Sequence, residues 1–127
     1  MNIPDNLWYS RTHEWVLFNG DKARVGLTDF AQDSMGDIVY INLPSAGDEI
    51  AVNGVIGEVE SVKAESEVHA PVGGIISAVN SALERTPENI NASPYESWII
   101  EIEDITGRDD LLSPAQYEAF CHEEQQA

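Results

Sequence analysis

Residues 57–74 read G-E-V-E-S-V-K-A-E-S-E-V-H-A-P-V-G-G, a stretch that places one lysine between two nearly mirrored runs. Residues 59–62 alternate apolar and polar before Lys63, and residues 65–68 return in much the same order after it. Alternation with a period of two on both sides of a short interruption is typical of a β-hairpin. The interruption, Lys63-Ala64, lacks the Asn-Gly or Gly-Gly pair that favours a tight turn. The symmetry nevertheless predicts a hairpin that projects the Lys63 amine into water at or near its tip.

The charge around Lys63 is unusual. An exposed lysine most often serves only to keep a surface solvated. This chain, however, has 2 lysines and 4 arginines against 23 acidic residues, and glutamates stand at positions 58, 60, 65 and 67. Lys63 is therefore a rare cation in an anionic field, which a modifying enzyme would find readily.

Length and charge limit the function classes. The 127 residues, 43% of them hydrophobic, predict one domain over residues 1–127, with room for a modest core but not for a deep catalytic cleft as well. A formal net charge of −17 argues against nucleic acid and anionic membrane surfaces as partners. The same charge fits basic protein partners and simple solubility equally well. No apolar run is long enough to span a bilayer.

Residues with potential chemistry are scattered. Cys121 is the single cysteine, which excludes an intramolecular disulfide and suits a reducing compartment. The three histidines at positions 13, 69 and 122 have no metal-ligand spacing with it, and no Ser/His/Asp grouping or phosphate-binding glycine loop occurs. Residues 1–5 lack the basic region and apolar core of a secretory signal. We expect a cytoplasmic bacterial protein, or a mitochondrial matrix protein if a targeting peptide has been removed.

Turn and cap signals define the elements on either side. Asn19-Gly20 lies between two alternating runs and predicts a hairpin of residues 13–18 and 22–27. Thr28 is placed to cap a short helix over residues 29–35. Ser113 and Pro114 open a C-terminal helix over about residues 113–124. Further strands are expected over residues 37–43, 48–52, 75–80 and 98–103, and residues 84–94 read as a loop with one helical turn at 87–90.

A weak internal echo suggests how these strands pack. The run G-D-I-V-Y-I-N-L-P at 36–44 precedes the lysine hairpin, and G-G-I-I-S-A-V-N at 73–80 follows it. Two such halves folded about the hairpin would form two small antiparallel sheets that face each other. Many short strands separated by Gly and Pro turns likewise predict a mainly β sandwich or barrel.

Two segments carry a family resemblance. E-S-V-K-A at 60–64, followed by A-P-V-G-G at 70–74, resembles the lipoyl-attachment segment of the glycine cleavage H-protein family. The resemblance covers nearly the whole chain, from His13-Glu14-Trp15 through Gly36-Asp37-Ile38-Val39-Tyr40 to Leu111-Leu112. It implies a lipoyl-domain-like barrel-sandwich hybrid, with a short helix in the N-terminal half, a C-terminal helix, and the lipoyl hairpin at residues 57–70.

The resemblance also implies a function. Lys63 would carry lipoic acid in amide linkage, with the small neighbours Val62 and Ala64 leaving its approach uncrowded. The chain would be a monomeric, non-catalytic carrier of the glycine cleavage system. It would take the aminomethyl group from the pyridoxal-phosphate glycine decarboxylase to the tetrahydrofolate-dependent aminomethyltransferase, and then electrons to the FAD-dependent dihydrolipoyl dehydrogenase. A lipoate ligase or an octanoyl transferase would attach the arm.

We call the lipoyl group on Lys63 the arm, and we call it loaded when it carries the aminomethyl group. Because a loaded arm is reactive in water, docking protects it where water is limited and a carboxylate pairs with its ammonium. We expect Glu14 to be that carboxylate, with Thr12 and Glu67 as weaker candidates. The alternative of a solvated strand edge at Thr12-His13-Glu14 fits the sequence as well.

Other functions stay open at this level. An H-like protein could relay lipoyl groups to other enzymes, and an unmodified acidic β-module could act only as a binding scaffold. A biotinyl carrier fits less well, because that class typically flanks its lysine with methionine, where Val62 and Ala64 stand here.

Overall fold

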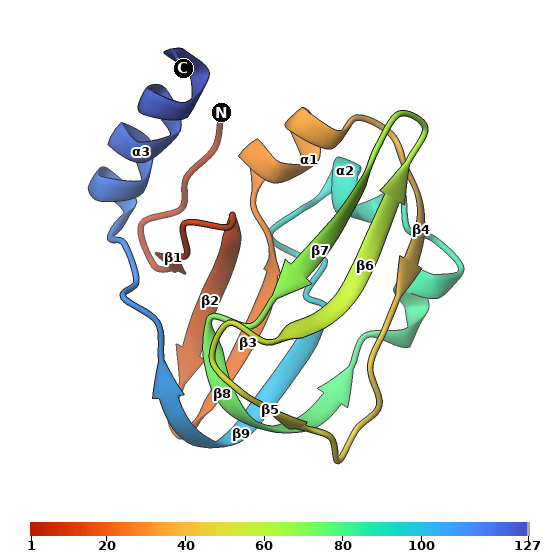
Figure 1. Cartoon of the computed structure of the whole chain (residues 1–127), viewed down its shortest axis with the longest axis vertical. Helices are drawn as coiled ribbons and strands as arrows, with labels where there is room; N and C mark the ends of the chain where they lie inside the picture. The colour runs from red at the N-terminus through yellow and green to blue at the C-terminus, as the bar shows by residue number, and fades with distance from the viewer. Residues whose placement is uncertain (127) are drawn as a thin grey trace.

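The computed structural model describes residues 1–126 (Figure 1). Its elements follow in the order β1 (Trp8–Tyr9), β2 (Glu14–Asn19), β3 (Lys22–Leu27), α1 (Asp29–Met35), β4 (Ile38–Asn42), β5 (Glu49–Ile50), β6 (Val55–Ser61), β7 (Glu65–His69), β8 (Val72–Val79), the 3-10 helix η1 (Ser81–Glu84), α2 (Asn89–Ala92), β9 (Ile100–Arg108) and α3 (Pro114–Gln126).

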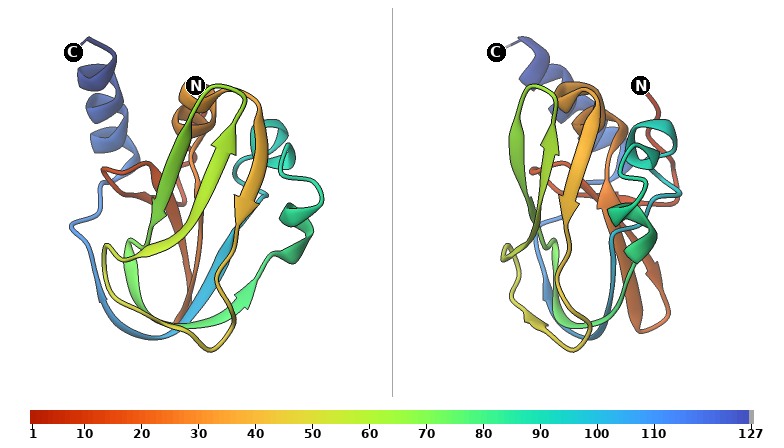
Figure 2. Two further views of the ribbon diagram at one scale, coloured as in Figure 1. Left: turned by 45° about the vertical axis from the view of Figure 1, so that its right-hand side comes forward. Right: turned by 90° about the vertical axis from the view of Figure 1, so that its right-hand side faces the viewer.

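The strands form two antiparallel sheets, which confirms the predicted mainly β fold. One sheet has six strands in the order β1-β2-β3-β9-β8-β5, and the other has three in the order β4-β6-β7. Figure 2 shows them as two layers, with the hairpin of β6 and β7 in the smaller one. The expected division into two halves is wrong, however, because β3 pairs with β9 and β5 pairs with β8. The two ends of the chain therefore share the larger sheet.

Local signals produce the first hairpin and α1 as predicted. Asn19 pairs with Lys22 across the turn between β2 and β3. The Thr28 hydroxyl accepts a hydrogen bond from the Ala31 amide at 3.1 Å, which caps the first turn of α1. Gly36 ends the helix with φ of 77° and ψ of −158°, a conformation that is open almost only to glycine.

Two late strands are longer than predicted. β8 begins at Val72, three residues early, because Gly73 and Gly74 lie inside the sheet instead of in a turn. A Cβ atom on Gly74 would stand 2.5 Å from the carbonyl oxygen of Glu103, so glycine is needed for close approach of the strands. β9 extends to Arg108 and pairs with this longer β8.

Other bounds differ at short elements. β5 covers only two residues of the predicted strand 48–52, and α3 runs two residues past the predicted end at 124. The one-turn helix expected at 87–90 is α2, displaced by two residues. The sequence did not predict β1 or η1. β1 depends on a distant partner, since Tyr9 pairs with Trp15 and bridges to Leu112.

The core has two parts. The larger fills the space between the sheets and holds residues such as Val16, Val25, Val59, Ile76 and Ile102. The smaller, which we name the α3 cluster, lies between α3 and the larger sheet and consists of Leu7, Tyr9, Trp15, Leu112, Tyr117 and Cys121. Tyr9 and Tyr117 stack with ring centroids 4.6 Å apart. This packing fixes α3 beside the start of β2, where the predicted arm-docking residues are located.

Candidate functional site

The tip of the hairpin between β6 and β7 carries Lys63. The Ser61 amide donates to the Ala64 carbonyl at 2.8 Å, and the Ser61 hydroxyl accepts from the amides of Lys63 and Ala64 at 3.3 and 3.1 Å. The Val62 amide donates to the Asp37 carbonyl at 3.1 Å, which ties the tip to the segment before β4. A serine hydroxyl thus closes the turn that no Asn-Gly pair provides. The sequence analysis did not identify this signal.

Lys63, Val62 and Ala64 are all exposed, and Val62 keeps 72% of its accessible surface in the fold. The lysine stem lies over Gly36 at the end of α1, since a Cβ atom there would be 3.3 Å from the Lys63 Cε. None of the ion pairs among residues 1–126 uses the Lys63 amine. The Lys63 amine is therefore outside the ion pairs of the described residues, and its stem runs from the hairpin tip over the end of α1.

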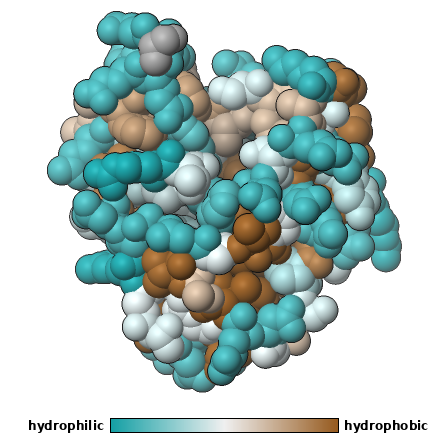
Figure 3. All heavy atoms as spheres, viewed as in Figure 1, coloured by the Kyte–Doolittle hydropathy of each residue, from teal (hydrophilic) through white to brown (hydrophobic). Residues whose placement is uncertain are grey.

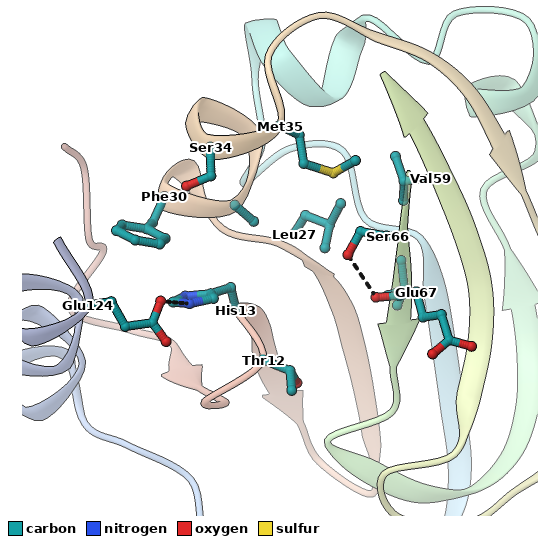
Figure 4. A pocket seen from close by; sticks show the side chains of 12 residues that line it. Thr12, His13, Leu27, Phe30, Ser34, Met35, Val59, Ser66, Glu67 and Glu124 are labelled. Carbon is teal, nitrogen blue, oxygen red and sulfur yellow. Dashed lines mark hydrogen bonds and ion pairs between the residues drawn. The ribbon is translucent and has the colours of Figure 1, made fainter. Parts of the chain in front are cut away.

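Below the hairpin, a cavity of about 210 Å³ runs between β7, α1 and the start of β2 (Figure 4). Its lining is apolar along α1 and β6 and polar near β2, and it consists of Thr12, His13, Leu27, Phe30, Ala31, Ser34, Met35, Val59, Ser66, Glu67, Val68 and Glu124. Met35 is the residue before Gly36, over which the Lys63 stem lies. Figure 3 shows this region as a hollow between α3 and the hairpin on a face that carries both hydrophilic and hydrophobic patches. We name it the hairpin cavity.

Two of the predicted arm-docking residues line the hairpin cavity from opposite sides. Thr12 comes from the segment before β2, and Glu67 comes from β7. In Figure 4 the Glu67 carboxylate points away from the Thr12 side of the cavity. It also borders a second hollow with Glu58 and Glu65, which precede and follow the hairpin tip. The cavity therefore meets the backbone of Glu67 more closely than its charge.

Glu14 is the first residue of β2 and is fully buried. One carboxylate oxygen accepts hydrogen bonds from the hydroxyls of Ser10, at 2.6 Å, and Thr12. The other accepts from the His69 amide at 3.2 Å. The expectation of a solvated strand edge is therefore wrong at Glu14, because the Ser10 and Thr12 hydroxyls fold over it. Glu14 is joined to the hairpin cavity through Thr12.

Burial raises the pKa of Glu14 above its usual 4.5, against the opposing effect of its hydrogen bonds and of the neighbouring His69. A carboxyl group that is buried, fully hydrogen-bonded and next to a cavity is the kind of group found at functional sites. The arrangement places the Glu14 carboxyl group behind the Thr12 hydroxyl, and Thr12 lines the hairpin cavity.

His13 forms the far wall of the hairpin cavity, and the sequence analysis did not select it. Its Nδ1 lies 2.7 Å from the Tyr117 hydroxyl and its Nε2 lies 2.8 Å from Glu124. The ring stacks on Phe30 with centroids 4.5 Å apart (Figure 4). Since His13 has a positive φ of 70°, the backbone turns there and sends the ring toward α1 and α3. Only the polar run Thr12-His13-Glu14 hinted at this position.

The described part of the chain contains neither a metal site nor a membrane-spanning helix. Residues 1–126 contain no group of three or more His, Cys, Asp or Glu side chains that could hold a metal ion. Within the same range, no helix is both long and apolar enough to cross a membrane. Cys121 is buried in the α3 cluster.

The chain is similar to known proteins along nearly its whole length. The family model described as glycine cleavage H-protein matches residues 7–124. The chain belongs to the glycine cleavage H-protein family. Glycine cleavage system H protein from Geobacillus thermodenitrificans is 51% identical over 126 residues, covering 97% of this chain and 99% of that protein. The H protein of Lachnoclostridium phytofermentans is 47% identical over 125 residues, covering 98% of both chains.

A solved structure agrees with the H-protein assignment. The crystal structure of a glycine cleavage system H protein from Mycobacterium marinum matches with a TM-score of 0.86 at 32% identity, covering 97% of this chain and 99% of that one. These comparisons confirm the family and the fold that the sequence indicated. They also confirm the expected role of a lipoyl-carrying H protein of glycine cleavage.

Proposed function

We propose that Lys63 bears lipoic acid in amide linkage and that the chain acts as a non-catalytic carrier. The single observation that carries the proposal is the exposed Lys63 at the hairpin tip, in a turn that Ser61 closes and with its stem over the end of α1. Lipoic acid would supply the redox-active disulfide that accepts the cargo, while the protein supplies position and surroundings. Its partners would be the decarboxylase, the aminomethyltransferase, the dihydrolipoyl dehydrogenase and a lipoate-attaching enzyme. The bacterial relatives favour the cytoplasm as its compartment.

Attachment requires the Lys63 amine to enter an acyl-transfer site as a free base. The exposed positions of Val62 and Ala64 leave both sides of the lysine open to such an enzyme. Lys22, the other lysine, instead lies 3.6 Å from Glu101 in an ion pair. This contrast gives a matched control for the carrier role.

Two variants test that role in a reconstituted glycine cleavage assay. Lys63→Arg keeps the charge but removes the acylatable amine, and glycine turnover is expected to fall to the level without carrier. Lys22→Arg should retain turnover close to wild type. Turnover by Lys63→Arg would refute the carrier role of this lysine, and equal loss in both variants would point to a general effect of lysine replacement.

We further propose that the hairpin cavity shelters the loaded arm and that Thr12, with Glu14 behind it, receives the ammonium of the cargo. A charge-assisted hydrogen bond contributes about 1.5–3 kcal/mol, which corresponds to roughly 10- to 150-fold in the docking equilibrium. Glu67 would contribute less, since its carboxylate points away from the Thr12 side in Figure 4. The apolar lining along α1 and β6 would limit the access of water.

The half-life of the loaded protein, followed by intact mass, tests the shelter. Glu14→Gln should shorten it by tenfold or more, whereas Glu67→Gln should change it much less. An unchanged half-life in Glu14→Gln removes Glu14 from this role without touching the function of Lys63.

A further inference from the structure

The Asn91 side chain, on α2, makes three hydrogen bonds at the end of α1. Its Oδ1 accepts from the Ile38 amide at 2.9 Å, and its Nδ2 donates to the Gly36 carbonyl at 2.9 Å. The same Nδ2 donates to Gln32 Oε1 at 3.0 Å. Figure 1 shows α2 beside α1, although 53 residues separate Asn91 from Ile38 along the chain. Asn91 thus binds both ends of residues 36–38, which we name the platform.

The platform supports the tip of the lysine hairpin. The Asp37 carbonyl accepts a hydrogen bond from the Val62 amide at 3.1 Å. Ile38 pairs with Ser61, whose hydroxyl closes the turn at the tip. The stem of the lysine lies over the first residue of the platform. All three platform residues therefore meet the tip, and Asn91 binds the first and the last of them.

A carboxamide is the group that fits position 91. A backbone N–H can only donate and a backbone carbonyl can only accept, so the side chain must offer one donor and one acceptor. Alanine offers neither and would leave the Ile38 amide and the Gly36 carbonyl without these partners. Aspartate has the same size and keeps an acceptor for Ile38, but it turns a second carboxylate oxygen toward the Gly36 carbonyl.

We propose that Asn91 is a positioning residue that holds the platform so that the hairpin tip presents Lys63 to an acyl-transfer enzyme. The inference rests on the proposed attachment of lipoic acid to Lys63. Asn91 acts through the backbone of the platform, and none of its hydrogen bonds reaches the lysine. When the platform is loosened, only a fraction of the molecules presents the tip correctly, and the apparent affinity of the enzyme for its protein substrate falls by that fraction.

The first measurement is the amide NMR spectrum of the unlipoylated protein from pH 4 to 8. In Asn91→Asp at pH 7 the resonances of residues 61–64 should move away from their wild-type positions. They should return as pH falls, because a protonated carboxyl group again has one donor and one acceptor, and the facing carbonyl oxygens favour that neutral form. Wild type over the same pH range corrects for the titration of other groups near the tip.

Two further variants separate the tip from the helix. Asn91→Ala should displace the same resonances at every pH. Asn89→Ala should leave them in place, because the Asn89 side chain bonds only to Thr86, in the adjoining loop, at 3.1 Å. A merely structural role in α2 would move the resonances of α2 alone. Wild-type resonances at residues 61–64 in folded Asn91→Asp and Asn91→Ala overturn the proposal.

The second measurement is the rate of lipoylation by a lipoate ligase over a range of protein concentrations. In Asn91→Ala the KM for the protein should rise roughly 3- to 10-fold, with kcat close to wild type. The control is Ile90→Val, which removes a methyl group from a buried side chain of the same helix and lowers stability without touching the platform. It should keep the wild-type KM.

The outcomes separate this inference from the proposed function. A wild-type KM in Asn91→Ala, or an equal rise in Ile90→Val, overturns the role of Asn91 while the carrier role of Lys63 stands. If wild type itself takes up no lipoyl group, the carrier role fails, and the NMR comparison at residues 61–64 still decides whether Asn91 positions the tip.

Discussion

Replacement of Gly36 by alanine tests the link between the end of α1 and the lysine. Gly36 has φ of 77° and ψ of −158°, and a Cβ atom there would lie 3.3 Å from the Lys63 Cε and 3.9 Å from its Nζ. Two separate effects are therefore expected. The backbone becomes strained, and the new methyl group crowds the stem of the lysine that is to be acylated.

The magnitude follows from the geometry. A residue other than glycine in this backbone region costs about 1–3 kcal/mol, so we expect Gly36→Ala to lower the free energy of unfolding by about 2 kcal/mol. For a chain of this size, such a change corresponds to a fall in Tm of roughly 6–10 °C. A Cβ contact of 3.3 Å is tight but not prohibitive, so the Lys63 stem must shift without being excluded. We expect attachment to slow severalfold but not to stop.

Gly20→Ala is the matched control, because Gly20 also has a positive φ, of 63°, and has no atom within 4 Å of a Cβ. It should lose about 1 kcal/mol of stability and be lipoylated at the wild-type rate. Tm is read by circular dichroism, and the rate by intact mass with a lipoate ligase well below either Tm. Wild-type stability and wild-type rate together in Gly36→Ala would refute the reasoning. A slow rate in both variants would assign the effect to lost stability.

Two further predictions concern the sheet and the buried carboxyl group. Gly57→Ala places a Cβ directly against the backbone carbonyl oxygen of Asn42, so β4 must move, and urea unfolding should show a loss of about 3 kcal/mol. A loss below about 1 kcal/mol would contradict the close packing of β4 on β6. Because burial raises the pKa of Glu14, its contribution to stability is present below its usual 4.5 and is lost as pH rises through the higher folded value. Wild type should therefore lose stability relative to Glu14→Gln between pH 4 and 8, and a difference that does not change with pH would show that folding leaves the pKa of Glu14 at its usual value.

The sequence predicted the elements whose signals are local. Asn19 with Gly20 and the Thr28 cap each act within a few residues, and both form as expected. The lysine hairpin was inferred from symmetry, and its actual cause, the Ser61 hydroxyl, is also local. A serine two residues before the tip is too common in sequences to have been selected by itself.

Elements that depend on distant partners were missed. β1 forms because Tyr9 pairs with Trp15 and bridges to Leu112. A run of two residues carries no sequence pattern that predicts such a pairing. In the sequence, Gly74 looks like a turn residue, but in the structure it lets β8 pack closely against β9. The same limit applies to the site, since Glu14 resembles a surface residue until the Ser10 hydroxyl folds over it.

The most direct test of the account is the intact mass of the protein after incubation with lipoic acid, ATP and a lipoate ligase, followed by peptide mapping. We expect the addition of one lipoyl group, confined to Lys63, with Lys22 unmodified in its ion pair with Glu101. Absence of any addition, by this enzyme and by octanoyl transfer alike, or addition at Lys22, would contradict the assignment of Lys63 as the carrier residue.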